Sequence, residues 1–231
     1  MNYSQIINRL PSLHLTTGKD PLREQFQYIQ VKTFDQPGTY GPAGIYATAT
    51  DAHTLVYCNL ADHLAGLENV PGPEILIKAD QYKKMTGSKV QFLDFAQPGQ
   101  IITRDLAGQQ LDAVPYLTAE QGPKYPNWPD ILPTAEPEPT DIIGIDPEKL
   151  AKICGVMNAG PLVVELRGAA RPVMVQYLNP EDQGTARGLI MPVYMWGDRK
   201  ERTDRAQAQA DKAYQQAKAT TALKRAEGAT A

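Results

Sequence analysis

The chain has 231 residues, of which 42% are hydrophobic, and it carries a formal net charge of −3. This is enough for one large or two small domains with buried cores. No segment approaches the roughly 20 apolar residues of a membrane span, and the N-terminus lacks a basic region followed by an apolar run. The acidic balance argues against a protein that grips nucleic acid over its whole surface. We therefore expect a soluble, cytoplasmic protein with no membrane contact.

The first predicted unit consists of a helix and three strands. Apolar residues near the N-terminus recur with the spacing of one helical stripe, which ends at Pro11. The stripe consists of Tyr3, Ile6, Ile7 and Leu10. The strands are expected at 27–34, 45–50 and 55–60. The first alternates in the way of a half-buried strand, with Ile29 and Val31 on one face, and the turn 51–53 joins the other two.

Two further units repeat one pattern of a strand, a helix and three strands. Their strands are expected at 74–78, 90–95, 100–104 and 110–117, and at 141–145, 162–167, 173–178 and 188–195. In the second unit Asp80 can cap the helix, whose buried side is Tyr82 and Met85. In the third, Asp146 is expected at the N-cap and Pro147 at the first helical position. Its apolar stripe consists of Leu150, Ile153, Cys154 and Met157. The units align at an offset of 68 residues, which predicts stacked copies of one supersecondary unit.

The C-terminal segment 197–231 differs from the rest in composition. It holds eight Lys and Arg against five Asp and Glu, and almost no large apolar side chains. The tail is therefore +3 and the body −6. Its alanines favour a helix, but such a helix has little to bury. We predict a charged, Ala-rich tail that is helical or disordered, and contact with DNA or a partner is the alternative.

Three segments resemble the bacterial DNA polymerase beta sliding clamp. The stretch ATATDAHTL at 47–55 is similar to the family's strand-turn motif A-T-D-G-H-R-L. The stretch KYPNWPDILP at 124–133 is similar to its F-P-D-Y-x-x-V-L-P segment. The stretches ARPVMV at 170–175 and GLIMPV at 188–193 resemble the closing strands that end in M-P.

The resemblance implies an α+β fold of DNA-clamp repeats, with helices on one face of antiparallel sheets. Residues 1–135 resemble the middle domain of a clamp, and residues 136–196 resemble the second half of its last domain. The N-terminal domain and the first half of the last domain have no counterpart. Ala52 and Thr54 replace the family's Gly and Arg in the turn, and the chain continues past the closing strand. A phage or mobile-element relative that has shed domains would have this organisation.

A clamp relative is expected to be a processivity factor or docking platform, without enzymatic activity, that encircles or tracks double-stranded DNA. It would recruit DNA polymerase or repair proteins that carry clamp-binding peptides. Each clamp domain is built from two units of this kind. Because three units cannot close a ring alone, we expect a homo-oligomer. The alternative is a clamp-derived interaction module that does not encircle DNA and instead mimics or inhibits the host clamp.

The resemblance also implies two sets of site residues. The peptide-binding pocket would be formed by Thr50, His53, Thr54, Leu55, Pro126, Ile131, Val173, Leu189, Met191, Pro192 and Val193. Basic residues on or beside the helices become candidates for phosphate contacts without base readout. These are Arg9, Lys83, Lys84, Lys89, Lys149 and Lys152. The alternatives are a solvated helix face for the basic residues and, for Leu55, Ile131 and Val173, a place in the core.

The sequence indicates no catalytic residues, no metal site and no cofactor. His53 lies beside Asp51, but His14 and His63 stand at no spacing that would complete a zinc site or a catalytic triad. We expect Asp51 to accept hydrogen bonds from the amides of its own turn instead. An enzyme that uses His53 is the weaker alternative.

Three further residues are expected to be structural. Cys58 and Cys154 each lie in an apolar stretch, which is typical of buried free thiols. Trp128 lies among prolines, which favours packing against its own domain over stacking on a base.

Overall fold

The computed structural model describes residues 3–67, 70–133, 145–157, 162–165, 172–177 and 186–191, all within one compact unit, Met1–Val193. The tail 197–231, most of the expected strand 141–145, and the pocket residues Pro192 and Val193 lie outside the described residues. Within the part of the chain that the structure describes, no helix is long and apolar enough to cross a membrane.

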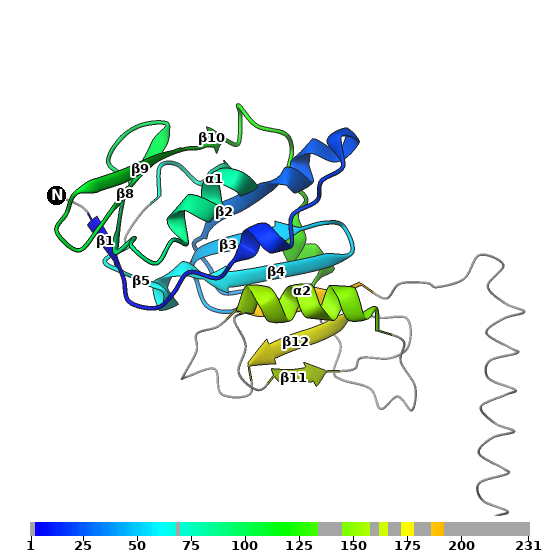
Figure 1. Ribbon diagram of the computed structural model, residues 1–231. Helices are drawn as coiled ribbons and strands as arrows, with labels where there is room; N and C mark the ends of the chain where they lie inside the picture. The colour runs from blue at the N-terminus through cyan, green and yellow to red at the C-terminus, as the bar shows by residue number, and fades with distance from the viewer. Residues whose placement is uncertain are drawn as a thin grey trace, which may run out of the picture. The chain divides into compact units, whose positions relative to one another are not determined.

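The elements form three successive units (Figure 1). The first contains β1 (Tyr3–Ile6), the 3-10 segments η1 (Leu13–Leu15) and η2 (Pro21–Gln27), β2 (Tyr28–Phe34), β3 (Gly44–Thr50), β4 (Thr54–Asn59), η3 (Leu60–Asp62) and β5 (Leu64–Ala65). The second contains β6 (Glu74–Lys78), α1 (Ala79–Met85), β7 (Phe92–Asp94), β8 (Gln100–Arg104), β9 (Gln110–Pro115), β10 (Leu117–Thr118) and η4 (Trp128–Ile131). The third contains α2 (Pro147–Met157), β11 (Leu162–Glu165), β12 (Val173–Tyr177) and β13 (Arg187–Ile190). A helix followed by three strands therefore recurs in the second and third units, as the sequence predicts.

The strands form two antiparallel sheets in which the first two units are interlocked. One sheet has eight strands in the order β10-β6-β2-β3-β4-β13-β12-β11, and the other has five in the order β5-β1-β7-β8-β9. The first strand of each of these units pairs with the strands of the other, because β1 lies beside β7 and β6 lies beside β2. Neither of the two units can therefore bury its own sheet alone.

The third unit extends the larger sheet of the first two. β13 pairs antiparallel with β4, so that Leu189 lies opposite Leu55. Figure 1 shows α2 lying across the strands at this junction. The mixed α+β class, with antiparallel sheets and few helices, is confirmed.

The helices cover one face of the eight-stranded sheet. Strand residues such as Val56 and Ile77 belong to the same core as side chains of α1 and α2, and η1 contacts both helices. The helix residues of this core are Tyr82, Met85, Ile153, Val156 and Met157. The buried sides predicted for the two helices are thus largely confirmed, although Cys154 is only half-buried and Val156 takes its place.

A second, largely aromatic core covers the opposite face of the same sheet. It consists of Tyr28, Tyr46, Leu55, Tyr57, Leu76, Tyr125, Trp128, Leu132, Met174 and Leu189. The segment 124–133 supplies the cover, and the rings of Trp128 and Tyr57 lie 4.8 Å apart. The structural role expected of Trp128 is confirmed, since it is 1% exposed. The expected half-burial of β2 is wrong, because this cover buries Tyr28 and Gln30 as well as Ile29 and Val31.

The N-terminal helix expected from the apolar stripe is also wrong. Tyr3–Ile6 is a strand that pairs with β5 and β7, and the chain continues without regular structure to Pro11. Ile7, a member of the stripe, is 53% exposed, whereas Leu10 is buried. A helix of so few residues is marginal in isolation, and the two sheet neighbours satisfy the backbone of β1 instead.

The N-cap predicted for α2 is confirmed, whereas the one predicted for α1 is wrong. Asp146 accepts a hydrogen bond from the Glu148 amide at 2.9 Å, as expected of the N-cap of α2. Lys78 occupies the N-cap of α1, and Asp80 lies inside its first turn without a capping bond. β6 runs directly into α1, so the helix begins one residue before Asp80.

Candidate functional site

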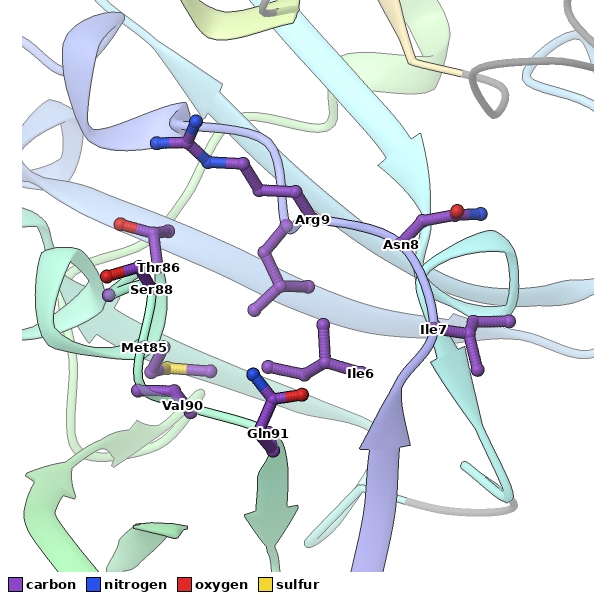
Figure 2. Close-up of a pocket in the computed structure, with 11 residues that line it drawn as sticks. Ile6, Ile7, Asn8, Arg9, Met85, Thr86, Ser88, Val90 and Gln91 are labelled. Atoms are coloured by element: carbon purple, nitrogen blue, oxygen red, sulfur yellow. The ribbon is translucent and has the colours of Figure 1, made fainter. Parts of the chain in front are cut away.

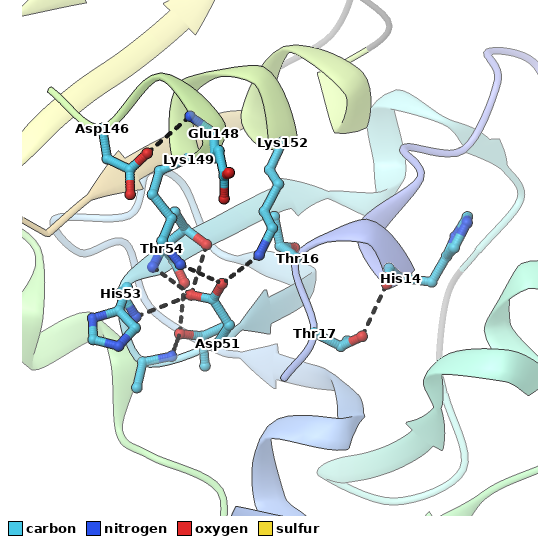
Figure 3. Close-up of polar contacts among 12 residues, drawn as sticks. His14, Thr16, Thr17, Asp51, His53, Thr54, Asp146, Glu148, Lys149 and Lys152 are labelled. Carbon is cyan, nitrogen blue, oxygen red and sulfur yellow. Dashed lines mark hydrogen bonds and ion pairs between the residues drawn. The ribbon is translucent and has the colours of Figure 1, made fainter. Parts of the chain in front are cut away.

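The turn between β3 and β4 is organised around the Asp51 carboxylate (Figure 3). One oxygen, Oδ1, accepts hydrogen bonds from the His53 amide at 3.0 Å, the Thr54 amide at 2.7 Å and the Thr54 hydroxyl at 2.8 Å. Ala52 adopts a left-handed conformation with φ 73°, a conformation that glycine adopts without strain. The predicted bonds from Asp51 to its own turn are confirmed.

The second oxygen of Asp51 binds two lysines of the third unit. Oδ2 lies 3.0 Å from Nζ of Lys152 and 3.3 Å from Nζ of Lys149, both on α2. Burial by itself would raise the pKa of the Asp51 carboxyl, but the hydrogen bonds from Lys152, Thr54 and His53 outweigh it. They hold the pKa well below its usual range, so Asp51 is ionised at neutral pH.

The two lysines of α2 are consequently less exposed than the sequence predicts. The side chain of Lys149 is 17% exposed and that of Lys152 is 38% exposed, and both share one carboxylate. The alternative of a solvated helix face therefore fails for Lys149, and Lys152 is half-buried as well. The pairing was not predictable from spacing, because Asp51 and the two lysines are about 100 residues apart in the chain.

A cavity of about 610 Å³ adjoins this ion-pair network, and basic residues outnumber acidic ones in its lining. Its charged residues are Lys19, Arg23, Lys149 and Lys152 against Asp20 and Asp51. Burial and the charge of Lys83 lower the pKa of His14, which also lines the cavity, so His14 adds no charge at neutral pH. The net positive lining favours an anionic group such as a phosphate. Lys19, which precedes η2, and Arg23, which lies within it, were not predicted because this stretch shows no apolar periodicity.

The basic residues of the second unit lie around the end of α1. Lys83, Lys84 and Lys89 are exposed, and Lys84 lies 3.9 Å from Asp112. A second cavity, of about 370 Å³, is lined by Lys19, Lys78 and Lys83 and shares His14 with the larger one. Basic side chains therefore extend from α1 past η1 to α2.

Arg9 lies on a segment without regular structure rather than on a helix. It borders a cavity of about 380 Å³ between residues 6–10 and the end of α1 (Figure 2). The apolar lining residues are Ile6, Ile7, Leu10, Met85 and Val90. Figure 2 shows the Arg9 side chain extending past the apolar residues toward Thr86. Arg9 is exposed, and within the described residues it forms no ion pair with a carboxylate.

Several residues expected in the peptide pocket meet at the junction of β4 and β13. The Met191 amide donates a hydrogen bond to the His53 carbonyl at 2.7 Å, which joins the β3–β4 turn to the end of β13. His53 is exposed, whereas Thr50 and Thr54 are buried. Met191 and Pro126 are half-buried, and Ile131 is 42% exposed on the covering segment.

The apolar wall residues of this expected pocket do not all face the same side. Leu55 and Leu189 lie in the aromatic core and are at most 1% exposed. Val173 lies in the core on the opposite, helix-covered face of the sheet, opposite Ile190 in the strand pairing. Val173 therefore has the core position that was the alternative for it, on the face of the sheet opposite to Leu55 and Leu189.

The remaining histidine and cysteines have structural surroundings. His63 Nδ1 lies 3.0 Å from the Arg9 carbonyl oxygen, and burial lowers the pKa of His63. Burial raises the pKa of the Cys58 thiol to about 12, which makes it unreactive as a nucleophile. Among the described residues, no group of three or more His, Cys, Asp or Glu side chains is arranged to hold a metal ion.

No protein-family model and no curated protein sequence matches the chain. Its fold does match solved structures. The beta subunit of DNA polymerase from Streptococcus pyogenes matches 79% of the chain with a TM-score of 0.57 and 12% identity. A DNA polymerase sliding clamp from Pseudomonas aeruginosa with a ligand matches 82% with a TM-score of 0.58 and 11% identity. A sliding clamp from Bartonella birtlesii bound to griselimycin matches 82% with a TM-score of 0.55 and 13% identity.

The matches cover part of each clamp. They span 62% of the Streptococcus pyogenes chain, 65% of the Pseudomonas aeruginosa chain and 66% of the Bartonella birtlesii chain. In the described part of this chain, the first two units are interlocked and the third is joined to them through β4 and β13. This part has the fold of the bacterial DNA polymerase sliding clamps.

Proposed function

We propose that the chain is a clamp-like docking platform that tracks double-stranded DNA and recruits proteins through short peptides, without catalysing a reaction. The observation that carries the proposal is the basic side formed by α1, η1 and α2 on a clamp fold. Exposed Lys83 and Lys89, the cavity lined by Lys19, and Lys152 lie along it. An acidic protein that concentrates basic residues on one side binds DNA locally, through phosphates and without base readout.

The DNA contact is tested by reversing one exposed charge on each side of the molecule. We expect Lys83→Glu to weaken binding to double-stranded DNA and to lower the slope of log affinity against log salt by about one, since one phosphate contact is lost. Lys124→Glu is the matched control, because Lys124 is an exposed lysine on the segment that covers the aromatic face. Binding measured by fluorescence anisotropy over a series of salt concentrations gives both slopes. Equal losses in the two variants would contradict a DNA-facing helix side.

Peptide recruitment is the second part of the proposal. The hydrogen bond between His53 and Met191 brings two expected pocket residues together, and Met191 is half-buried, as an adaptable lining residue would be. We expect Met191→Ala to weaken binding of a Q-L-x-L-F-type peptide by on the order of 2 kcal/mol, about 30-fold. Leu106→Ala, a truncation of an apolar residue that is 77% exposed in another turn, should have no effect. No binding of such a peptide by the parent protein at high micromolar concentration would refute this part.

The alternative function is a clamp-derived module that binds clamp-binding peptides without encircling DNA. The observation that favours it is that the match covers less than two thirds of the Streptococcus pyogenes clamp chain. Electron microscopy of the purified protein separates the two functions. Closed rings support the platform that encircles DNA, whereas peptide binding by particles that never close would favour the module.

A further inference from the structure

His14 lies where the two basic cavities beside η1 meet. The larger cavity, of about 610 Å³, extends from His14 to the lysines of α2, and the smaller, of about 370 Å³, extends from it to Lys78 and Lys83. Figure 3 shows the His14 ring pointing away from Asp51. The charge of Lys83 acts on the ring. The imidazole therefore belongs to the smaller cavity, which we call the His14 socket.

The socket contains three lysines whose charges are not used elsewhere. Lys19, Lys78 and Lys83 are exposed, and none of them forms an ion pair among the residues that the structure describes. In the described lining, the acidic residue is Asp80, which accepts a hydrogen bond from Gln81 at 3.2 Å. Three ammonium groups against one carboxylate leave an excess of positive charge, which attracts an anion.

The cations of the larger cavity differ because they already face carboxylates. Lys149 and Lys152 share the carboxylate of Asp51. Arg23 lies 3.9 Å from Asp20. An anion that enters the larger cavity must compete with these carboxylates, so the socket is the more favourable place for it.

The His14 ring offers the socket a neutral hydrogen-bond donor. Its Nδ1 atom is enclosed by protein and has no hydrogen-bond partner among the described residues. A proton on Nδ1 would lack an acceptor, so the neutral ring carries its proton on Nε2. Burial and the charge of Lys83 lower the pKa of His14, so the ring is uncharged at neutral pH.

We propose that the His14 socket binds a phosphate group and that His14 takes up a proton from solvent when the group enters. A phosphate oxygen accepts a hydrogen bond from Nε2, and the negative charge of the phosphate offsets the repulsion between the ring and Lys83. The protonated ring then adds a charge-assisted hydrogen bond to those that the three lysines donate.

The charged and titratable groups around His14 come from every element that packs against it. They are Lys19, Asp20 and Arg23 from the segment before β2, Asp51 and His53 from the β3–β4 turn, Lys78, Asp80 and Lys83 from β6 and α1, and Lys149 and Lys152 from α2. Cations outnumber carboxylates in this set by six to three. An added anion is therefore what favours a charged ring.

The affinity for phosphate should consequently rise as pH falls. The complex holds one proton more than its separate parts, because the pKa of His14 is higher in the complex than its lowered value in the free protein. Between these two pKa values the affinity increases by up to about tenfold per pH unit, and below the lower one His14 adds no further change.

The phosphate can belong to the DNA backbone or to a free oligophosphate. In the first case the inference rests on the proposed function, because the basic side of the clamp fold would bring a backbone phosphate to the socket. In the second case it is independent of that function.

NMR of the imidazole groups in the full chain tests the socket. Spectra are recorded between pH 5 and 8 for the protein alone, with inorganic pyrophosphate and with double-stranded DNA. The resonance that is lost in His14→Gln identifies His14. We expect the midpoint of its titration to move to higher pH when the phosphate binds. His63 is the matched internal control, since it is a buried histidine that lines neither cavity.

The two ligands distinguish the sources of the phosphate. A shift with DNA alone assigns a backbone phosphate, a shift with pyrophosphate alone assigns a free oligophosphate, and a shift with both shows that the socket accepts either. No shift with DNA or with millimolar pyrophosphate, or an equal shift of His63, overturns the inference. A shift with pyrophosphate in a protein that does not bind DNA would support the socket and refute the DNA contact of the proposed function.

The pH dependence of DNA affinity gives a second measurement. At constant ionic strength, the affinity of the parent protein should increase by roughly three- to tenfold more between pH 7.5 and 5.5 than that of His14→Gln. Glutamine keeps a hydrogen-bond donor but does not titrate, and the phosphodiesters of DNA do not titrate in this range. Equal pH dependence of the two proteins would contradict proton uptake by His14 on a DNA phosphate.

Discussion

The Asp51 side chain joins the first unit to the third through polar contacts. It orders its own turn through one carboxylate oxygen and binds Lys149 and Lys152 through the other. The same turn accepts a hydrogen bond from the Met191 amide through the His53 carbonyl. The ion pairs of Asp51 and the backbone hydrogen bond of His53 therefore both join the third unit to this one turn.

We expect Asp51→Asn to lower the free energy of unfolding by about 1–2 kcal/mol at neutral pH, because the amide keeps the turn hydrogen bonds but loses the attraction of the two ammonium groups. The depressed pKa of Asp51 implies that this stability is fully present above the unfolded-state pKa of about 4 and is lost as pH falls toward the lower folded-state pKa.

Urea unfolding at pH 7, 5 and 3 measures this difference. The gap between the parent protein and Asp51→Asn should be similar at pH 7 and 5 and smaller at pH 3. Asp35→Asn is the control, since Asp35 is exposed and forms no ion pair among the described residues. A gap that does not depend on pH would mean that the ion pairs with Lys149 and Lys152 contribute nothing.

At the scale of elements, the packing of α2 on β13 depends on a glycine. A β-carbon at Gly188 would lie 2.6 Å from Cγ2 of Ile153, closer than van der Waals contact allows. Gly155 on α2 differs, because a β-carbon there would meet Leu15 of η1 at an ordinary 3.5 Å. One glycine is thus required by close packing, and the other is tolerated within a helix.

These two glycines give opposite expected outcomes for the same substitution. Gly188→Ala should destabilise the protein by about 1–3 kcal/mol, because α2 must shift away from the sheet. Gly155→Ala should stabilise it by about 0.5–1 kcal/mol through helix propensity. Thermal unfolding of both variants is the measurement. Similar melting temperatures for the two would show that α2 does not pack on β13 in solution as described.

At the scale of the whole molecule, the eight-stranded sheet holds the third unit to the first two. β13 pairs with β4 along four residues, and α2 contacts both strands. Aromatic side chains cover the other face of the same sheet. The body is therefore expected to unfold as one cooperative unit without help from the C-terminal segment.

Deletion of 197–231 should leave the melting temperature within a few degrees of that of the parent protein. The segment has so few large apolar side chains that it can bury little apolar surface against the body. Differential scanning fluorimetry of the two proteins at equal concentration makes the comparison. A larger fall would show that the segment contacts the body and contributes to its stability.

Local patterns in the sequence predicted the two α-helices, most of the longer strands and the α+β class of the fold, although not the first element. Strand periodicity, the caps around Pro147 and the offset between the second and third units were sufficient, because these signals are local in the chain. The resemblance of 47–55 and 124–133 to clamp motifs agrees with the fold of the solved clamps. For these features, short-range patterns and tertiary structure favour the same conformation.

Contacts between residues far apart in the chain could not be predicted from the sequence. The residues expected to form the first helix became strand β1 because two sheet neighbours satisfy its backbone, which no local pattern encodes. Val173 and Leu189 lie on adjacent strands, but strand register places them on opposite faces of the sheet. Lys149 and Lys152 are paired because folding brings Asp51 beside α2 from about 100 residues away. Long-range pairing and burial are set by the assembly of all three units, whereas a sequence read locally specifies each unit alone.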